Sequence, residues 1–568
     1  MNIKKLLITI LLYTGILFSV PLDTNLSSSD QTVQALKKSF KKSPSMLLKN
    51  IPQKKFLKNF YRKNKYTPLW IKSDKFNKEK YTKLFKHIQN DITLNQKGLI
   101  YKNYKTLENQ LENNLSKIQT LRIELKLSSL YYNFLVHTIY GEIQWKKFSY
   151  KLSSLKKRRI NGSWVKVKPK FNITKIMKNN DIDLSVKRVT PQNFGYPGLL
   201  LALEKLKKLK EKGTWEELPY FKRLALGSTG DIVLKLRSRL KISGDYLDCN
   251  QTDSCTVFTD EHNLSHDINL SRNAVFGHCL DQAVKTFQQR HGLVVDGIVG
   301  GGTRKALNVT IDDKIHKIRL NIDRIKWLPR EEQERFIVVN IPEFMLHYIE
   351  DGQTKQKLRV IVGDKRHPTP IFSQKISFIV LNPYWKVPEG IVKREIVPAM
   401  IKNPNYLKQQ GLVAHRTWSE KSRIIDTSWL FWEDYLYGEK FPYRLMQPPG
   451  PKNALGKIKF KFPNRFAVYL HDTPTRHLFK RNTRAFSHGC VRLSNPRELL
   501  ETIATFNTNI DIRKAKKILK GKRKKQLNMQ EKLRIYLVYL TAGMNEKGQI
   551  EFRNDIYNYD KYQKRRLR

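Results

Sequence analysis

Two short stretches of the sequence contain the residues best suited to covalent chemistry. The first, Val468-Tyr-Leu-His-Asp-Thr-Pro474, places His471 at the end of an apolar run. The second, Phe486-Ser-His-Gly-Cys-Val-Arg-Leu493, places Cys490 directly after Gly489, a residue that permits a tight turn and the close approach of a substrate. A thiol becomes a good nucleophile when a neighbouring imidazole takes its proton, which gives a thiolate–imidazolium pair. We therefore expect Cys490 to attack a carbonyl, with His471 as its base.

The residues beside this cysteine supply other groups that acyl transfer requires. We expect the backbone N–H groups of Gly489 and Cys490 to face outward at the turn and to stabilise an oxyanion. Arg492 could position a substrate carboxylate or pair with another group of the protein. Ser487 and His488 are expected to line the substrate, with His488 also shaping the turn.

Tyr469 is a further candidate for contact with the substrate. Because successive side chains of a strand alternate between its two faces, we expect Tyr469 to face away from His471. It is therefore interpreted first as a lid or core residue, which a distorted strand end could still bring to the site.

Three alternatives use the same residues differently. A single thiol in an exported protein can be an unreactive leftover, and a single histidine is commonly a satisfied core residue. Asp472 would complete a triad with His471, but in Asp-Thr-Pro it favours capping its own turn, and a backbone carbonyl could orient the imidazole equally well. A zinc site is imaginable, although its ligands lack the close-paired spacing of typical zinc motifs. Those ligands would be His471, His477, His488 and Cys490.

The hydrophobic pattern of the segments that must position these residues changes near residue 335. From there, apolar residues recur at every second position in short runs between turn signals, a pattern typical of a β-rich sandwich or barrel. The segment 388–451 interrupts this pattern with three tryptophans and many prolines, and predicts a subdomain inserted beside the site. After a basic helix, residues 534–540 are expected to rejoin the sheet. The other predicted strands are 336–341, 345–349, 358–362, 376–381 and 466–470.

The first part of the chain, residues 30–215, is predicted to be mainly helical. Apolar side chains recur there every three or four positions, most clearly at 121–136 and 199–209. Gly213 follows the second of these segments, as expected at the end of a helix.

Residues 220–308 are predicted to form a second compact unit of short helices. Asp231 is expected to open the first helix, and Asp281 to cap another whose apolar face includes Phe287. A Gly-containing turn then precedes Thr303, where the last helix is expected to begin.

The N-terminal 22 residues have the pattern of an export signal. Lys4 and Lys5 precede an apolar run, residues 6–20, that is shorter than the ~20 residues of a comfortable membrane-spanning helix. No clear cleavage motif follows, so either a cleaved signal peptide or an uncleaved N-terminal anchor is expected. In an oxidising compartment two of the three clustered cysteines could pair, but their spacing does not determine which. They are Cys249, Cys255 and Cys279.

The charge of the chain restricts its partners only loosely. There are 107 Lys and Arg residues against 50 Asp and Glu, a formal net charge of +57, which attracts polyanions such as nucleic acid, an anionic membrane surface or an acidic cell-wall polymer. Because Lys, Asn and Ile are abundant throughout, compositional bias is the favoured explanation. No recognition helix, RNP-type aromatic strand or zinc finger is evident, so nucleic acid is not an expected partner.

The segment Ser487–Arg492 resembles the active-site signature of the L,D-transpeptidases, and His471 matches the histidine that this family uses as base. Further motifs resemble the large periplasmic branch of the family in Gram-negative bacteria, some members of which have serine in place of His488. These motifs are Phe60-Tyr61, Pro68-Leu-Trp70, Asn340-Ile-Pro-x-Phe-x-Leu-His-Tyr, Val360-Ile-Val-Gly, Thr369-Pro-Ile-Phe-Ser, Leu381-Asn-Pro-Tyr-Trp-x-Val-Pro, Gly450-Pro-Lys-Asn-Ala-Leu-Gly, Leu478-Phe-Lys-Arg and Asp555-Ile-Tyr-Asn-Tyr-Asp.

Residues 220–308 resemble the three-helix peptidoglycan-binding domain. The resemblance rests on Gly-Ser-x-Gly-Asp, Ala-Val-Lys-x-Phe-Gln and Gly-Leu-x-x-Asp-Gly, which occur in the order of that family. The Cys-bearing insertion and the Gly301-Gly302 pair depart from its pattern, and a packing module without a ligand stays an alternative.

Together these resemblances imply a multidomain α+β protein of the periplasm, possessing a β-sandwich catalytic domain with an inserted lid. The expected parts are a signal peptide or anchor (1–22), a helical scaffold domain (30–215), a peptidoglycan-binding-like domain (220–308), the catalytic domain (334–513) with its lid (388–451), and a basic helix with a final strand (514–568).

The resemblance implies that Cys490 attacks a tetrapeptide stem of peptidoglycan at meso-diaminopimelate, releases D-Ala, and transfers the acyl group to the amine of another stem. It implies acylation by carbapenems, no metal or organic cofactor, peptidoglycan peptide and glycan as partners, and no obligate protein partner. Water or a lipoprotein lysine as acceptor, or a non-catalytic wall-binding role, are the alternatives.

Overall fold

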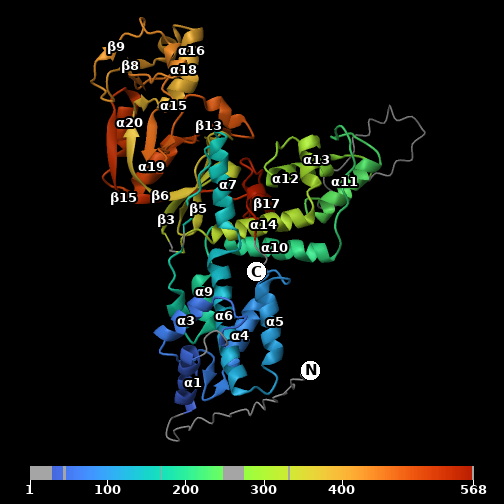
Figure 1. Ribbon diagram of the computed structural model, residues 1–568. Helices are drawn as coiled ribbons and strands as arrows, with labels where there is room; N and C mark the ends of the chain where they lie inside the picture. Colours follow the sequence, from blue (N-terminus) through green and yellow to red (C-terminus); the bar gives the residue numbers. More distant parts are fainter. Residues whose placement is uncertain (1–27, 43–46, 168, 247–273, 331–332, 566–568) are drawn as a thin grey trace, which may run out of the picture. The chain divides into compact units, whose positions relative to one another are not determined.

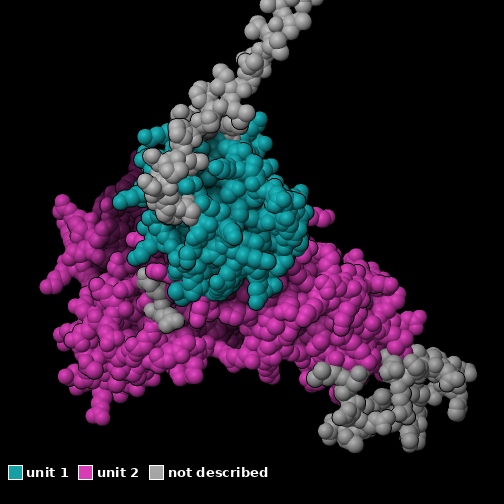
Figure 2. All heavy atoms as spheres, turned by 90° about the horizontal axis from the view of Figure 1, so that it is seen from below, with its two compact units in different colours: residues 1–90, 100–134, 172–185 teal, residues 91–99, 135–171, 186–568 magenta. Residues whose placement is uncertain are grey.

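The computed structural model of the chain describes residues 28–42, 47–167, 169–246, 274–330 and 333–565 (Figure 1). The chain divides into two compact units (Figure 2). The leader expected at 1–22 and Cys249 and Cys255 lie outside the described residues. In the part that is described, no helix combines the length and the apolar character needed to cross a membrane. Unit 1 comprises residues 1–90, 100–134 and 172–185, and unit 2 comprises residues 91–99, 135–171 and 186–568.

Unit 1 is built from helices around a buried carboxylate. Glu124 of helix α6 accepts hydrogen bonds from the Tyr61 hydroxyl at 2.6 Å and from the backbone N–H of Trp70 at 3.0 Å. Burial raises the pKa of the Glu124 carboxyl above its ordinary value. The predicted helix at 121–136 is confirmed, because α6 contains it. The elements are α1 (Ser28–Lys42), α3 (Lys54–Lys63), β1 (Ile71–Lys72), β2 (Lys75–Phe76), α4 (Lys78–Asn90), α5 (Leu99–Gln110), α6 (Lys117–Tyr140), α8 (Ile173–Met177) and α9 (Ile182–Val189), of which α5, α6 and α9 continue into unit 2.

Unit 2 begins with a helical frame. Helix α7 spans Trp145–Lys157, α10 spans Tyr196–Glu211 and α14 spans Ile311–Ile325. Apolar residues of α10 and α14 share one buried cluster. The predicted helix at 199–209 is confirmed, and Gly213 lies just beyond its end with a positive φ of 111°, which glycine adopts without strain.

The predicted compact unit of short helices is also present. Helices α11 (Asp231–Ile242), α12 (His278–Arg290) and α13 (Gly301–Leu307) enclose their own apolar core. Two predicted helix starts are wrong. Helix α12 begins at His278, so Asp281 lies in its first turn, where a carboxylate stabilises the helix dipole, and α13 begins before Thr303. Cys279 is disulfide-bonded.

The C-terminal part of unit 2 is a nine-stranded sheet that closes on itself, because β4 pairs with both β3 and β5. The predicted final strand is confirmed: β15 lies between β6 and β3. The basic helix α20 (Ile512–Lys520) and α19 (Pro496–Phe506) cover the core. The expected mixed α+β architecture is therefore confirmed. In order across the sheet the strands are β13 (Ala485–Ser487), β5 (Gln353–Gly363), β14 (Val491–Leu493), β12 (Leu470–His471), β11 (Ile458–Lys461), β6 (Phe372–Leu381), β15 (Lys525–Val538), β3 (Arg335–Asn340) and β4 (Met345–Glu350).

One predicted strand is much shorter than expected. Of residues 466–470, only Leu470 belongs to a strand, because Ala467 has a positive φ of 54° and breaks the extended chain. The strand continues to His471, so this residue closes β12 as predicted.

The segment 388–451 packs as a subdomain of its own, which Figure 1 shows at one end of the sheet. It has a separate apolar core and a four-stranded sheet in the order β7-β10-β8-β9. The strand β7 (Trp385–Lys386) lies just before this segment. The elements within it are α15 (Glu389–Ile391), η3 (Val392–Ile396), α16 (Val397–Lys402), α17 (Tyr406–Gln410), β8 (Val413–His415), β9 (Ile424–Ile425), α18 (Asp434–Tyr437) and β10 (Arg444–Gln447).

Candidate active site

The two chemical motifs meet because β12 and β14 are parallel neighbours in the sheet. His471 is in register with Arg492, and Cys490 lies directly before β14. In-register side chains of parallel strands point to the same face, as do side chains two positions apart. Tyr469, His471, Cys490 and Arg492 consequently line one cavity of about 480 Å³. Gly489 has a positive φ of 108°, so the predicted tight turn before Cys490 is present.

The imidazole of His471 is oriented by a backbone carbonyl. Its Nδ1 lies 2.5 Å from the carbonyl oxygen of Asp472, which leaves Nε2 as the nitrogen able to accept a proton. The Asp472 carboxylate is used elsewhere, since it accepts the N–H of Thr473 at 2.8 Å and the N–H of Lys457 at 2.9 Å. Of the two predicted ways to orient His471, the carbonyl is therefore the one present, and Asp472 caps its own turn.

Burial controls the protonation of both reacting groups. It lowers the pKa of His471 to about 3, and the nearby positive charge of Arg492 acts in the same direction. Burial also raises the pKa of the Cys490 thiol. Both shifts favour a neutral thiol and a neutral imidazole in the resting site, because burial disfavours the charged forms. The expected thiolate–imidazolium pair would then form only as the thiol proton is transferred.

Tyr469 lies inside the cavity, contrary to the prediction that it faces away from His471. The two residues are two positions apart, so the period of a strand places them on the same face, and their ring centroids are 5.6 Å apart. The backbone N–H and the hydroxyl of Tyr469 act on the Cys490 thiol in the opposite direction to burial and lower its pKa. The ammonium group of Lys459 lies 3.7 Å from the centroid of the Tyr469 ring.

The turn before Cys490 is held by a serine hydroxyl. Ser487 Oγ accepts the N–H of Gly489 at 3.1 Å and donates to the carbonyl oxygen of Cys490 at 2.5 Å. The Gly489 N–H is therefore not free for an oxyanion, which corrects the expectation of two donors. The Cys490 N–H remains, and no acceptor for it is found within the described residues.

Arg492 has hydrogen-bonding capacity to spare at the cavity. Its Nη1 donates to Thr475 Oγ1 at 3.1 Å, whereas its buried Nε has no partner among the described residues. A buried donor without a partner is costly, so such a group is typical of a site that a ligand completes. The guanidinium suits a carboxylate of the substrate.

His488 points to a different set of groups. Its Nε2 lies 2.6 Å from Glu395 Oε1, which comes from the subdomain 388–451, and its ring centroid is 4.6 Å from that of His367. The hydrogen bond to Glu395 raises the pKa of His488. The interaction joins the nucleophile turn to the inserted subdomain.

Several residues beside the site were missed by sequence reasoning. Glu395 carries no local signal, because its partner His488 comes from a distant part of the chain, and nothing beside Lys459 in the sequence indicates its contact with the Tyr469 ring. Thr369 and Tyr557 lie within motifs noted above but received no role. The alternative zinc site is not assembled: nowhere in the described ranges do three or more His, Cys, Asp or Glu residues gather as a metal would require.

Comparison with known proteins divides the chain into three matched regions. Residues 334–512 match the family model described as "L,D-transpeptidase catalytic domain". Residues 55–203 match the "Scaffold domain", and residues 262–307 match the "Putative peptidoglycan binding domain".

Among curated proteins, a Haemophilus influenzae protein named "Putative L,D-transpeptidase" is 34% identical over 259 residues, which is 46% of this chain and 50% of the relative. The match thus spans half the length of that relative. Among solved structures, an L,D-transpeptidase from Xylanimonas cellulosilytica (16% identity, TM-score 0.18, 56% of this chain, 99% of that one) is similar. So is one from Stackebrandtia nassauensis (15% identity, TM-score 0.21, 56% of this chain, 94% of that one).

Proposed function

We propose that the chain cross-links peptidoglycan stem peptides with Cys490 as its nucleophile, because residues 334–512 match the family model of the L,D-transpeptidase catalytic domain. The observation that carries the proposal is the meeting of Cys490, His471 and Arg492 in one cavity. These three side chains provide a nucleophile, a proton acceptor and a carboxylate partner.

The proposed first half-reaction starts from the neutral pair. As the Cys490 sulfur bonds to the carbonyl carbon of meso-diaminopimelate in a tetrapeptide stem, His471 Nε2 takes the thiol proton. The Cys490 N–H stabilises the oxyanion. When the C–N bond to the terminal D-Ala breaks, the imidazolium returns the proton to the leaving amine. The products are a thioester on Cys490 and free D-Ala.

The second half-reaction transfers the acyl group. The side-chain amine of a diaminopimelate in another stem attacks the thioester, and neutral His471 takes a proton from that amine and gives it to the departing sulfur. A diaminopimelate–diaminopimelate cross-link results. Neutral His471 is available for this step at neutral pH, since the pKa of its imidazole is lowered to about 3.

Incubation of the purified protein with tetrapeptide muropeptides tests the proposal. Mass spectrometry should find dimers that have lost one D-Ala, and none with Cys490→Ala. Tripeptide monomers alone would indicate that water is the acceptor, hence an L,D-carboxypeptidase, and unchanged tetrapeptides would favour a non-catalytic wall-binding role. Adding a lipoprotein peptide with a free lysine amine tests the remaining acceptor.

The other regions would serve the same substrate outside the cytoplasm. The match at 262–307 supports contact with glycan or stem peptide, and the net charge of +57 suits a carboxylate-rich polymer. The leader expected at 1–22 supports export to the periplasm, with or without retention at the inner membrane. A fusion of this leader to a reporter that is active only after export should be active, and should lose its activity when charged residues replace the apolar run.

A further inference from the structure

Three backbone segments meet without intervening side chains on the inner side of the nucleophile turn. A Cβ added to Gly363 would lie 2.0 Å from the carbonyl oxygen of His367, 2.7 Å from the N–H nitrogen of Thr369 and 3.0 Å from Gly489 Cα. Only glycine therefore allows the end of β5, the 367–369 loop and the turn before Cys490 to pack this closely. Such buried backbone needs hydrogen-bond partners.

Two buried hydroxyls supply those partners. Thr369 Oγ1 accepts the N–H of Gly363 at 2.8 Å and donates to the carbonyl oxygen of Gly489 at 2.9 Å. The Tyr557 hydroxyl donates to the carbonyl oxygen of Gly363 at 2.6 Å and accepts the N–H of Thr369 at 3.2 Å. Thr369 has no exposed surface and Tyr557 has 5%. The Tyr557 hydroxyl thus connects the end of β5 to the 367–369 loop, and Thr369 connects both to the turn at Gly489.

The bond to the Gly489 carbonyl has a direct consequence for Cys490. The carbonyl of Gly489 and the N–H of Cys490 belong to the same planar peptide, and none of the described peptide bonds is cis. In a trans peptide the C=O and N–H point in opposite directions. Holding this carbonyl inward on Thr369 therefore directs the Cys490 N–H outward, and that N–H is the donor assigned above to the oxyanion.

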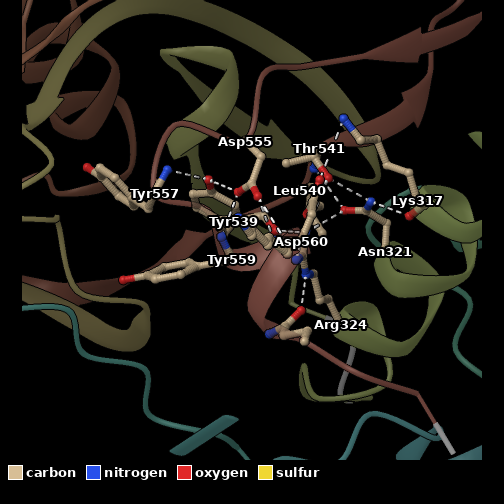
Figure 3. Close-up of polar contacts among 12 residues, drawn as sticks. Lys317, Asn321, Arg324, Tyr539, Leu540, Thr541, Asp555, Tyr557, Tyr559 and Asp560 are labelled. Atoms are coloured by element: carbon tan, nitrogen blue, oxygen red, sulfur yellow. Dashed lines mark hydrogen bonds and ion pairs between the residues drawn. The ribbon is translucent and has the colours of Figure 1, made fainter. Parts of the chain in front are cut away.

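The position of Tyr557 is itself fixed by a buried polar network (Figure 3). Asp555 accepts the hydroxyl of Tyr539 at 2.6 Å, and that hydroxyl accepts the backbone N–H of Tyr557 at 2.9 Å. Asp560 pairs with Arg324 of α14 at 2.7 Å. Figure 3 shows the side chains of Tyr557 and Tyr559 leaving this network on the same side. The segment 555–560 is consequently a rigid base for the Tyr557 hydroxyl.

We propose that Tyr557 and Thr369 are positioning residues for acyl transfer, which hold the Gly489–Cys490 peptide so that the Cys490 N–H faces the oxyanion. The inference rests on the proposed function, because only acyl transfer develops an oxyanion. It assigns a role in the reaction to the C-terminal segment, which contributes no atom to the cavity.

The test compares two reactions of Cys490 in the full chain. Acylation by a carbapenem passes through an oxyanion, whereas alkylation by iodoacetamide displaces iodide at a saturated carbon and forms none. Tyr557→Phe should slow acylation about tenfold or more, since removal of an oxyanion donor costs about a hundredfold and misalignment a part of that. Its rate of alkylation at Cys490, followed by peptide mass, should match the wild type.

Tyr559→Phe is the matched control. Tyr559 comes from the same segment and is equally buried, but its hydroxyl has no partner in the described structure. Loss of that hydroxyl should leave both rates unchanged. Thr369→Val and Thr369→Ser provide a second pair, which decides the question if Tyr557→Phe does not fold. Valine should slow acylation and not alkylation, whereas serine, which keeps the hydroxyl, should restore acylation.

Three results would overturn the inference. Acylation may be unchanged in Tyr557→Phe and in Thr369→Val, acylation and alkylation may fall by the same factor, or Thr369→Ser may be as slow as Thr369→Val. Failure of the proposed function can be distinguished from failure of this inference alone. If the proposed function is wrong, the wild type will be alkylated at Cys490 but not acylated at all, and the inference will then be wrong as well.

Discussion

The two sides of the turn at residues 487–490 differ in how completely their polar groups are hydrogen-bonded within the protein. On the inner side, the hydroxyls of Thr369 and Tyr557 each accept one hydrogen bond and donate another. On the cavity side, the buried Nε of Arg492 has no partner within the described chain, and His471 lines the cavity. The satisfied side can fix the position of backbone atoms, and the unsatisfied side can gain bonds only from a ligand.

This difference indicates how substitutions should behave. Changes on the cavity side remove chemistry and should hardly affect folding, because these groups make few bonds within the protein. Changes on the inner side should affect stability and rate together, because a lost hydroxyl leaves buried backbone groups without partners. The predictions below, in order of decreasing effect, test the cavity side of this contrast, and the Tyr557 and Thr369 variants described above test the inner side.

The largest effect is expected for Cys490→Ala. The variant should lose both acyl-enzyme formation and cross-linking completely, because no other group of the cavity replaces the sulfur. Its melting temperature should stay close to that of the wild type, since the one hydrogen bond of the thiol within the described residues is a long contact of 3.9 Å with the carbonyl oxygen of Ala467. Thermal unfolding and muropeptide analysis measure the two properties. Residual cross-links would show that the nucleophile is misassigned.

The next largest effect separates the two histidines. His471→Ala should slow acylation by about a hundredfold or more, the usual cost of removing a general base. His488→Ala should lose far less, because Glu395 raises the pKa of His488 and favours a protonated ring that cannot accept the thiol proton. Carbapenem acylation rates for both variants measure the difference. Equal losses would mean that the imidazoles act together, and a large loss for His488→Ala alone would move the base into the turn.

A smaller effect is expected when the guanidinium of Arg492 is replaced. Arg492→Gln should raise KM for the tetrapeptide by about tenfold, because a charge-assisted hydrogen bond to a carboxylate is lost. Arg492→Lys keeps the charge but not the planar fork, so its KM should lie between those of the other two enzymes. Steady-state kinetics with tetrapeptide substrate decide the matter. A normal KM in Arg492→Gln would leave the unpartnered Nε without a function in binding.

The smallest effect concerns pH. An ordinary histidine becomes protonated, and useless as a base, as the pH falls through about 6.5. The pKa of His471 is lowered to about 3, so its imidazole stays neutral until far lower pH. The acylation rate at Cys490 should therefore change little between about pH 7 and pH 5. A loss of rate centred near pH 6.5 would indicate an exposed or charged imidazole, and would contradict the neutral resting pair.

The sequence predicts the cavity side of the turn far better than the inner side. His471, Gly489, Cys490 and Arg492 are recognisable because their types and local order carry the chemistry. The strands β4 and β5 follow from apolar alternation, since their burial alternates with the same period over much of their length, whereas β3 and the end of β6 are continuously buried.

The remainder depends on contacts that no local pattern contains. Tyr557 reaches Gly363 across 194 positions of the chain, and nothing in its neighbours indicates which backbone group its hydroxyl will meet. The bond between Glu395 and His488 likewise requires the placement of a whole subdomain. The positive φ of Ala467, which shortens β12, is not expected for alanine and is imposed by the surrounding fold.

The central claim is that Cys490 forms the acyl-enzyme, and intact-protein mass spectrometry after exposure to a carbapenem tests it most directly. The wild type should gain the mass of one drug molecule, and peptide mapping should place the adduct on Cys490. Cys490→Ala should gain nothing under the same conditions. An adduct that persists in Cys490→Ala, or that maps to another residue of the wild type, would contradict the account.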